Sequence, residues 1–159
     1  MSARARELAE RFEQASESFA AAVERLSDEE WHTRCPGEER TVAALAHHVA
    51  WGYAVEARAF RAIALGEPVE GWTRAGLDRV NADQGQEYAQ CDRAETVALL
   101  RRQAASAADF VRALTDEQLD RSGVYLEGVT ARTVEQWIAR VLIGHPGAHL
   151  ASIWTALDE

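Results

Sequence analysis

Two histidines, His145 and His149, lie four residues apart in an apolar stretch near the end of the chain. Side chains at positions i and i+4 of a helix are neighbours on one face, so both imidazoles can reach one point. Two buried imidazoles leave polar nitrogens unpaired when neutral and repel each other when charged, whereas a divalent cation satisfies both. The spacing therefore points to a metal ion, and the rest of the chain must supply a third ligand.

The best candidate for that third ligand is His48, on the inner face of a helix predicted over residues 41–65. Its neighbour His47 lies roughly 100° round the same helix. Three imidazoles on one side of an ion leave a position open for water or substrate, as in catalytic zinc sites. For any single histidine, the alternative is a core side chain that hydrogen-bonds to a backbone carbonyl. We predict a metal site of His48, His145 and His149, with His47 as the alternative to His48.

Amphipathic segments predict the elements that must hold these side chains. Capping residues at Thr41, Asp92 and Thr133 mark helix starts, and Gly66 marks a helix end. The segment 121–132 is expected to be an irregular link, and no stretch makes a convincing strand. The predicted helices cover residues 2–26, 41–65, 74–90 (half exposed), 92–114 and 133–157, with short turns after Ser27 and Thr115. The expected architecture is one all-α domain over residues 1–159, a four-helix bundle with short extra helices.

The last predicted helix contains a proline between its two histidines. At helical spacing one apolar stripe includes both of them, and Pro146 and Gly147 lie between. Proline removes a backbone hydrogen bond and clashes with the carbonyl four residues back, here that of Leu142. A kink there either aims His145 at the ion or disturbs the i, i+4 geometry. The stripe comprises Val134, Ile138, Val141, Leu142, His145, His149, Ile153 and Ala156.

Composition and charge exclude several functional classes. The net charge of −9, with no basic cluster, argues against binding to a nucleic-acid backbone. No apolar run approaches the ~18 residues of a membrane span, and the start of the chain is not signal-like. Cys35 and Cys91 have no CxxC spacing, so we expect unpaired, inert thiols in a reducing cytoplasm. The five tryptophans are expected in the core or at a dimer interface more often than in a pocket.

Three stretches of the sequence resemble the DinB-like (DinB/YfiT-type) superfamily. They are Leu26-Ser27-Asp28-Glu29-Glu30-Trp31, then Cys35-Pro36-Gly37, then the run from Thr41-Val42 to His48-Val49. In that superfamily a Thr-Val opening leads, seven residues on, to a metal-binding histidine, and this spacing selects His48. A late H-x-x-x-H or E-x-x-x-H motif supplies two more ligands, matched here by His145 and His149.

The resemblance implies a four-helix bundle with long crossover connections, a divalent metal near one end, and a homodimer. Relatives include the mycothiol-dependent maleylpyruvate isomerase N-terminal domain and S-transferases that use mycothiol or bacillithiol. In such enzymes the metal binds a low-molecular-weight thiol and lowers its pKa. The fold and the metal site carry over better than the reaction. Zn²⁺ or Ni²⁺ is the expected ion for three imidazoles.

Two hypotheses of different class follow. The first is a cytoplasmic metal-dependent enzyme acting on a small molecule, by thiol-dependent transfer or isomerisation, with metal-assisted hydrolysis second. The second is a non-catalytic dimeric binding or stress-response protein whose metal is structural or absent. A di-iron bundle is excluded because it needs an E-x-x-H motif on each of two helices, and the sequence has only one, Glu29-Glu30-Trp31-His32. A metalloprotease is excluded because no H-E-x-x-H motif occurs. The sulfoxide synthase motif H-x-x-x-H-x-E fails because Ala151 stands at its last position.

Overall fold

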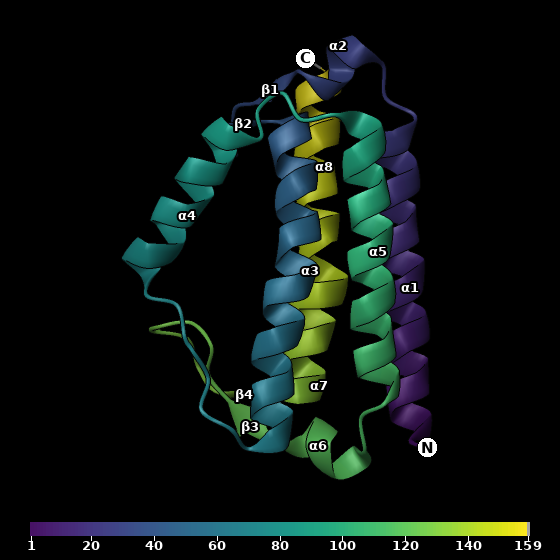
Figure 1. The fold of residues 1–159 in the computed structure, drawn as a ribbon, viewed down its shortest axis with the longest axis vertical. Helices are drawn as coiled ribbons and strands as arrows, with labels where there is room; N and C mark the ends of the chain where they lie inside the picture. Colours follow the sequence, from purple (N-terminus) through teal and green to yellow (C-terminus); the bar gives the residue numbers. More distant parts are fainter. Residues whose placement is uncertain (159) are drawn as a thin grey trace.

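The structure, a computed structural model, describes residues 1–158, and its long helices stand side by side as a bundle (Figure 1). These are α1 (Ala3–Glu24), α3 (Val42–Leu65), α5 (Arg93–Arg112) and a C-terminal column. The column runs through α7 (Val134–Trp137), the π-helix η1 (Ile138–Gly144) and α8 (His145–Asp158). Helix α5 packs against α1 and α3, and the column closes the bundle against the same two helices. The predicted four-helix bundle is confirmed.

Short elements make the connections between the long helices. Helix α2 (Asp28–Trp31) follows α1, and α6 (Asp116–Asp120) follows α5. Helix α4 (Arg74–Glu87) leans outward from the bundle in Figure 1 and contacts α3. Two antiparallel pairs of two-residue strands join β1 (Arg34–Cys35) to β2 (Arg40–Thr41), and β3 (Ser122–Gly123) to β4 (Arg132–Thr133). No strand is predicted from the sequence, because a two-residue strand is too short to show an alternating pattern.

The helix boundaries follow the capping residues that the sequence identified. The Thr41 hydroxyl accepts a hydrogen bond from the backbone N–H of Ala44 at 3.1 Å, which fixes the start of α3. Gly66 ends that helix with a left-handed φ of 70°, a conformation that glycine adopts without strain. Capping boxes open α2, α6 and α7 at Ser27, Thr115 and Thr133. The predicted starts are therefore correct.

The C-terminal column is not the uniform α-helix that the sequence predicted. Its middle third, η1, is a π-helix of seven residues that ends directly before His145 and Pro146. Pro146 has no backbone N–H and cannot donate an α-helical hydrogen bond to Leu142. The π-helix therefore ends close to the position where the α-helical hydrogen-bond pattern is interrupted. A π turn takes up more residues than an α turn, and the buried face continues through Pro146. His145, predicted to lie in the buried stripe, is exposed.

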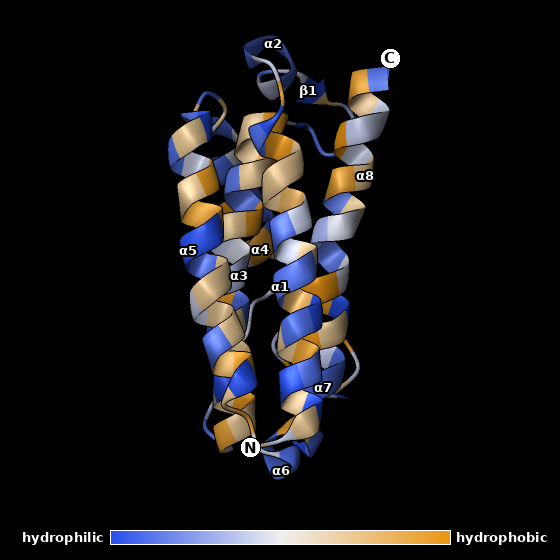
Figure 2. Ribbon diagram, turned by 90° about the vertical axis from the view of Figure 1, so that its right-hand side faces the viewer, coloured by the Kyte–Doolittle hydropathy of each residue, from blue (hydrophilic) through white to orange (hydrophobic). Residues whose placement is uncertain are grey.

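Hydrophilic and hydrophobic residues alternate along each long helix (Figure 2), and the buried apolar residues of these helices form one core. Trp31, Phe12, Phe19, Tyr53 and Phe60 are among its largest side chains, each at most 1% exposed. No helix in residues 1–158 is both long enough and apolar enough to cross a membrane.

Candidate metal centre

Three histidines from two facing helices meet at one small cavity. His48 comes from the first half of α3, and His145 and His149 come from the first turns of α8. The centroid of the His149 ring lies 5.4 Å from that of His48 and 4.4 Å from that of His145. All three side chains line the cavity between the helices. The structure thus brings together the three residues that the sequence selected, although they are 97 or more positions apart across α3 and α8.

The second nitrogen of His149 is held by a carboxylate. His149 Nδ1 lies 3.0 Å from Glu38 Oε1, and the imidazole is almost fully enclosed. Its other nitrogen, Nε2, is buried and has no hydrogen-bond partner among the described residues. A buried polar atom without a partner is costly and rare. A carboxylate on one nitrogen with the other left free is the arrangement that orients histidine ligands of metal ions.

His48 is oriented in a similar way by an amide. Its Nδ1 lies 3.4 Å from Oε1 of Gln84, a side chain of α4 that is only 8% exposed. This contact leaves His48 Nε2 as the nitrogen available to a ligand. The outlying helix α4 therefore contributes to the centre through one side chain, Gln84, which contacts His48.

The surroundings of His48 and His145 favour their neutral forms, which metal binding requires. Burial lowers the pKa of His48 to about 3, and the positive charge of Arg40 acts in the same direction. Burial and the neighbouring His149 also lower the pKa of His145. Neutral imidazoles carry the free lone pair that a cation needs.

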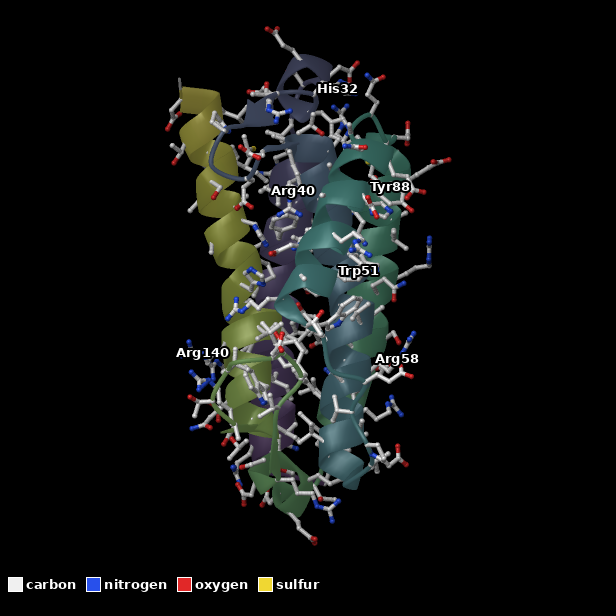
Figure 3. The ribbon with its side chains drawn as sticks, turned by 90° about the vertical axis from the view of Figure 1, so that its left-hand side faces the viewer. His32, Arg40, Trp51, Arg58, Tyr88 and Arg140 are labelled. Atoms are coloured by element: carbon white, nitrogen blue, oxygen red, sulfur yellow. The ribbon has the colours of Figure 1, made fainter. Side chains whose placement is uncertain are left out.

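Glu38 reaches His149 because of the turn between β1 and β2. Glu39 has a left-handed φ of 55°, which is uncommon for a residue with a side chain and reverses the chain within four residues. Arg40 Nη2 lies 3.1 Å from the other Glu38 oxygen. The hydrogen bond from His149, followed by that from Arg40, holds the pKa of Glu38 at about 2. Arg40 lies on the same side of the molecule as Trp51 and Arg58 (Figure 3).

The histidines are close to one another but not in a finished ligand geometry. Within residues 1–158, no three His, Cys, Asp or Glu side chains already stand as a metal-ligand group. The rings of His145 and His149 are tilted by 38° and those of His48 and His149 are perpendicular. His145 is the exposed member of the three, so its side chain has room to turn. Ligation by His48, His145 and His149 therefore stays a prediction, and the free Nε2 of His149 is the feature that fits an ion.

His47, the alternative ligand, faces another part of the molecule. Its ring stacks on Tyr88 with a centroid distance of 3.5 Å and an angle of 12°. The two cysteines are unpaired, as expected, and burial raises the pKa of both thiols. Buried thiols with raised pKa values are poor nucleophiles.

Glu38 and Gln84 are the site residues that sequence reasoning missed. Glu38 belongs to a four-residue turn whose shape depends on Glu39, and Gln84 lies on a helix of low apolar content. Neither spacing nor periodicity indicates that they contact a histidine. The only signal in the sequence was chemical, since a carboxylate or an amide oxygen is the usual partner of a metal-bound imidazole.

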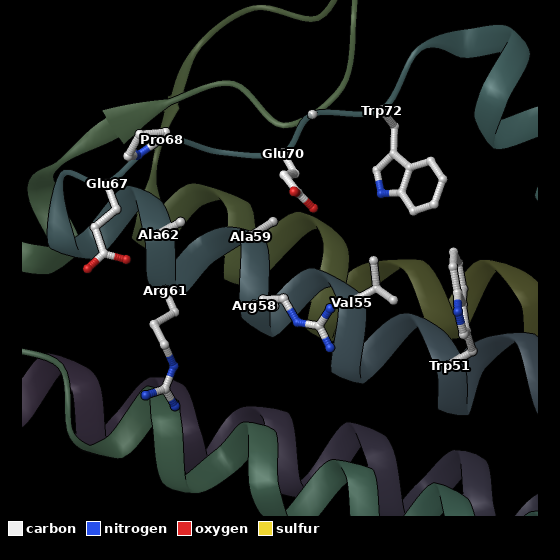
Figure 4. A pocket seen from close by; sticks show the side chains of 11 residues that line it. Trp51, Val55, Arg58, Ala59, Arg61, Ala62, Glu67, Pro68, Glu70 and Trp72 are labelled. Atoms are coloured by element: carbon white, nitrogen blue, oxygen red, sulfur yellow. The ribbon is translucent and has the colours of Figure 1, made fainter.

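A groove runs along α3 and begins at Trp51 (Figure 4). It has a volume of about 730 Å³ and lies between α3 and the segment 67–72. Trp51 and Trp72 form one end, with ring centroids 5.8 Å apart, and Trp51 also packs on His48 at 5.8 Å. Arg58 extends along it in Figure 4. The volume is within the range of small-molecule sites.

Comparison with known proteins agrees with this architecture. The family model described as the DinB superfamily matches residues 11–153. Among solved structures, the fold is similar to that of YfiT from Bacillus subtilis, with a TM-score of 0.80 and 19% sequence identity. The match covers 99% of this chain and 89% of YfiT, which is described as a probable metal-dependent hydrolase with an unusual four-helix bundle topology. No curated protein matches in sequence. Since the family model spans most of its length, the chain belongs to the DinB superfamily.

Proposed function

We propose that this protein is a divalent-metal-dependent enzyme. His48, His145 and His149 hold the ion, and water at the remaining position is the nucleophile of a hydrolysis reaction. The observation that carries the proposal is His149, whose buried Nε2 has no partner while its Nδ1 is held by Glu38. Membership of the DinB superfamily and similarity to a probable metal-dependent hydrolase support it.

Each part of the site has a role in this proposal. A Zn²⁺ or Ni²⁺ ion held by the three histidines would supply Lewis-acid chemistry, which lowers the pKa of a bound water. Glu38 and Gln84 fix which nitrogen of His149 and His48 faces the cavity. His145 is the one histidine of the three that is both exposed and in the lining of the cavity, so a small-molecule substrate can reach it from solvent. The groove that ends at Trp51 offers room for the rest of that substrate.

Thiol-dependent transfer is the second candidate function. The groove beside His48, at about 730 Å³, is large enough for the body of a mycothiol-type or bacillithiol-type cofactor. In that reaction the ion binds the sulfur of the cofactor in place of water. The protein's own cysteines do not supply such a thiol, since Cys35 is 1% exposed and outside the groove.

Zinc binding tests the proposed centre. Isothermal titration of untagged protein should give one Zn²⁺ per chain, and His48→Ala or His149→Ala should weaken binding by more than the roughly 10–100-fold expected for an outer partner. His47→Ala is the matched control, because the His47 ring stacks on Tyr88 and does not line the cavity. This variant should bind zinc with wild-type affinity. Equal zinc affinity in all three variants would overturn the proposal.

Cobalt substitution distinguishes the candidate reactions. If water is the ligand, the visible spectrum of the Co²⁺ protein should change with pH and stay unchanged on adding mycothiol or bacillithiol. A new sulfur-to-cobalt band on adding either thiol would favour the transferase. A spectrum that responds to neither would favour a structural metal in a non-catalytic module.

We also propose that the protein is a homodimer. A monomer in light scattering would contradict this dimer.

A further inference from the structure

Glu56 is a carboxyl group beside the proposed centre that is neither a proposed metal ligand nor a hydrogen-bond partner of a histidine. It lies on α3, two turns after His48, and borders the same small cavity as the three histidines. It forms no hydrogen bond or ion pair with any residue that the structure describes, and burial alone dominates its surroundings. Glu56 is half-buried, and the nearby Tyr53 hydroxyl is fully buried without a partner. A half-buried carboxyl group with no polar partner, beside a cluster of histidines, is a candidate for a functional role.

The sequence of α3 places this carboxyl group on the same helix face as the His48 imidazole. His48, Gly52 and Glu56 follow one another at intervals of four residues, so they share one face of the helix. Gly52 has no side chain, and a Cβ atom there would lie 3.4 Å from Glu56 Oε1. Val141 and Pro146 of the C-terminal column border the same small cavity. The three imidazoles and the Glu56 carboxyl group are therefore all part of its lining.

The charge state of Glu56 suits a group that exchanges a proton. Burial raises its pKa to about 8, so the metal-free protein holds it protonated at neutral pH. The other ionisable groups near it are the phenols of Tyr53 on α3 and Tyr125 in the link before β4. The histidines of α8 stand across the cavity. A divalent cation at those histidines would favour the ionised carboxylate and expel the proton.

We propose that Glu56 is the proton acceptor of the metal centre. Its carboxylate removes one proton from the nucleophilic water: the water O–H bond breaks, and a Glu56 O–H bond forms. The electron pair left on oxygen then makes the new bond to the electrophilic atom of the substrate. Glu56 returns the proton to the departing group, which regenerates the carboxylate, so atoms and charge balance. This role rests on the proposed hydrolytic function.

The proton count on zinc binding tests this role without any substrate. Titrating Zn²⁺ at pH 7 in buffers of different ionisation enthalpy gives the number of protons released per ion. Wild-type protein should release close to one proton more than Glu56→Gln, while both bind zinc with similar affinity. Glu70→Gln, which removes an exposed carboxyl of the neighbouring groove, is the matched control and should release as many protons as wild type.

A second measurement guards against a folding defect in the glutamine variant. Infrared spectra of the metal-free wild-type protein at pH 7 should show a protonated carboxyl band that disappears when zinc is added. Glu56→Asp, which keeps the acid, should retain the band, and Glu56→Gln should lack it. Equal proton release from wild type and Glu56→Gln, or a band unaffected by zinc, would overturn the role of Glu56. Neither result would affect the histidine variants, so failure of the centre itself is distinguishable.

Discussion

The α1–α5 and α3–α8 interfaces of the bundle differ in where their polar groups lie and in whether these groups have partners. Where α1 meets α5, the charges lie on the outside and are paired: Arg101 contacts Glu17 at 2.8 Å and Glu24 at 2.9 Å. Where α3 meets α8, polar atoms lie inside and lack partners, among them His149 Nε2 and the Tyr53 hydroxyl. Unpaired buried groups cost stability, so a fold keeps them where they are used. The α1–α5 interface therefore stabilises the bundle, and the α3–α8 interface is where we place the proposed metal centre.

The largest expected effect comes from the core of the α1–α5 side. Leu100 of α5 is 1% exposed, and Leu100→Ala should lower the free energy of unfolding by up to about 5 kcal/mol, through lost burial and a cavity. Urea denaturation measures this loss. Zinc affinity of the folded variant should equal that of wild type. A change in zinc affinity would show that packing at the α1–α5 interface affects the α3–α8 interface.

A pH effect of on the order of 3 kcal/mol should come from Glu56. Its pKa is raised from 4.5 to about 8 in the folded protein, so the unfolded chain ionises first. The stability linked to this neutral carboxyl is fully present below pH 4.5 and is lost as the pH rises to 8. Wild-type stability should therefore fall between pH 5 and 8 more steeply than that of Glu56→Gln, as measured by urea denaturation of metal-free protein. Parallel curves would contradict the burial of this carboxyl.

Glu38→Gln should weaken zinc binding by roughly 10–100-fold, because the amide holds His149 less strongly than a carboxylate does. Calorimetry at pH 7 measures the change. Glu39→Gln is the neighbouring control, since its side chain makes no hydrogen bond to the histidine, and it should bind zinc as wild type does. Equal weakening in both variants would mean that the turn, and not the contact to Nδ1, determines affinity.

The smallest effect is expected from the outer ion pairs. Arg101→Ala removes contacts to Glu17 and Glu24, yet all three side chains are at least 40% exposed. Exposed pairs contribute little and are screened by salt. The midpoint of thermal unfolding should fall by less than about 2–4 °C. A larger drop would show that these pairs contribute to the bundle as a network.

The sequence predicted the fold well because local signals set its boundaries. Thr41 and Gly66 determine the two ends of α3 through hydrogen bonding and φ preference alone. The same helix places His48 on its inner face, and that prediction needed only the 3.6-residue period. The expected contact of His48 with the late histidines depended on the bundle, and the structure confirms their proximity.

The parts that could not be predicted depend on contacts between distant segments. His145 was expected to be buried because the stripe was drawn with one period, whereas η1 changes the period ahead of it. Glu38 meets His149 across 111 positions of sequence, through a turn that Glu39 bends. Gln84 reaches His48 only because α4 folds back over α3. No local pattern records such contacts.

The π-helix sets the phase between the two ends of the C-terminal column. Thr133 fixes where the column starts, and a uniform α-helix from that point would determine the direction of every later side chain. The wide turns of η1 separate the two ends, so α7 can follow the packing of Trp137 while α8 presents His149 to Glu38. The length of η1 thus acts as a rotational adjustment, in which a single added or deleted residue would turn one end of the column relative to the other by about 100°.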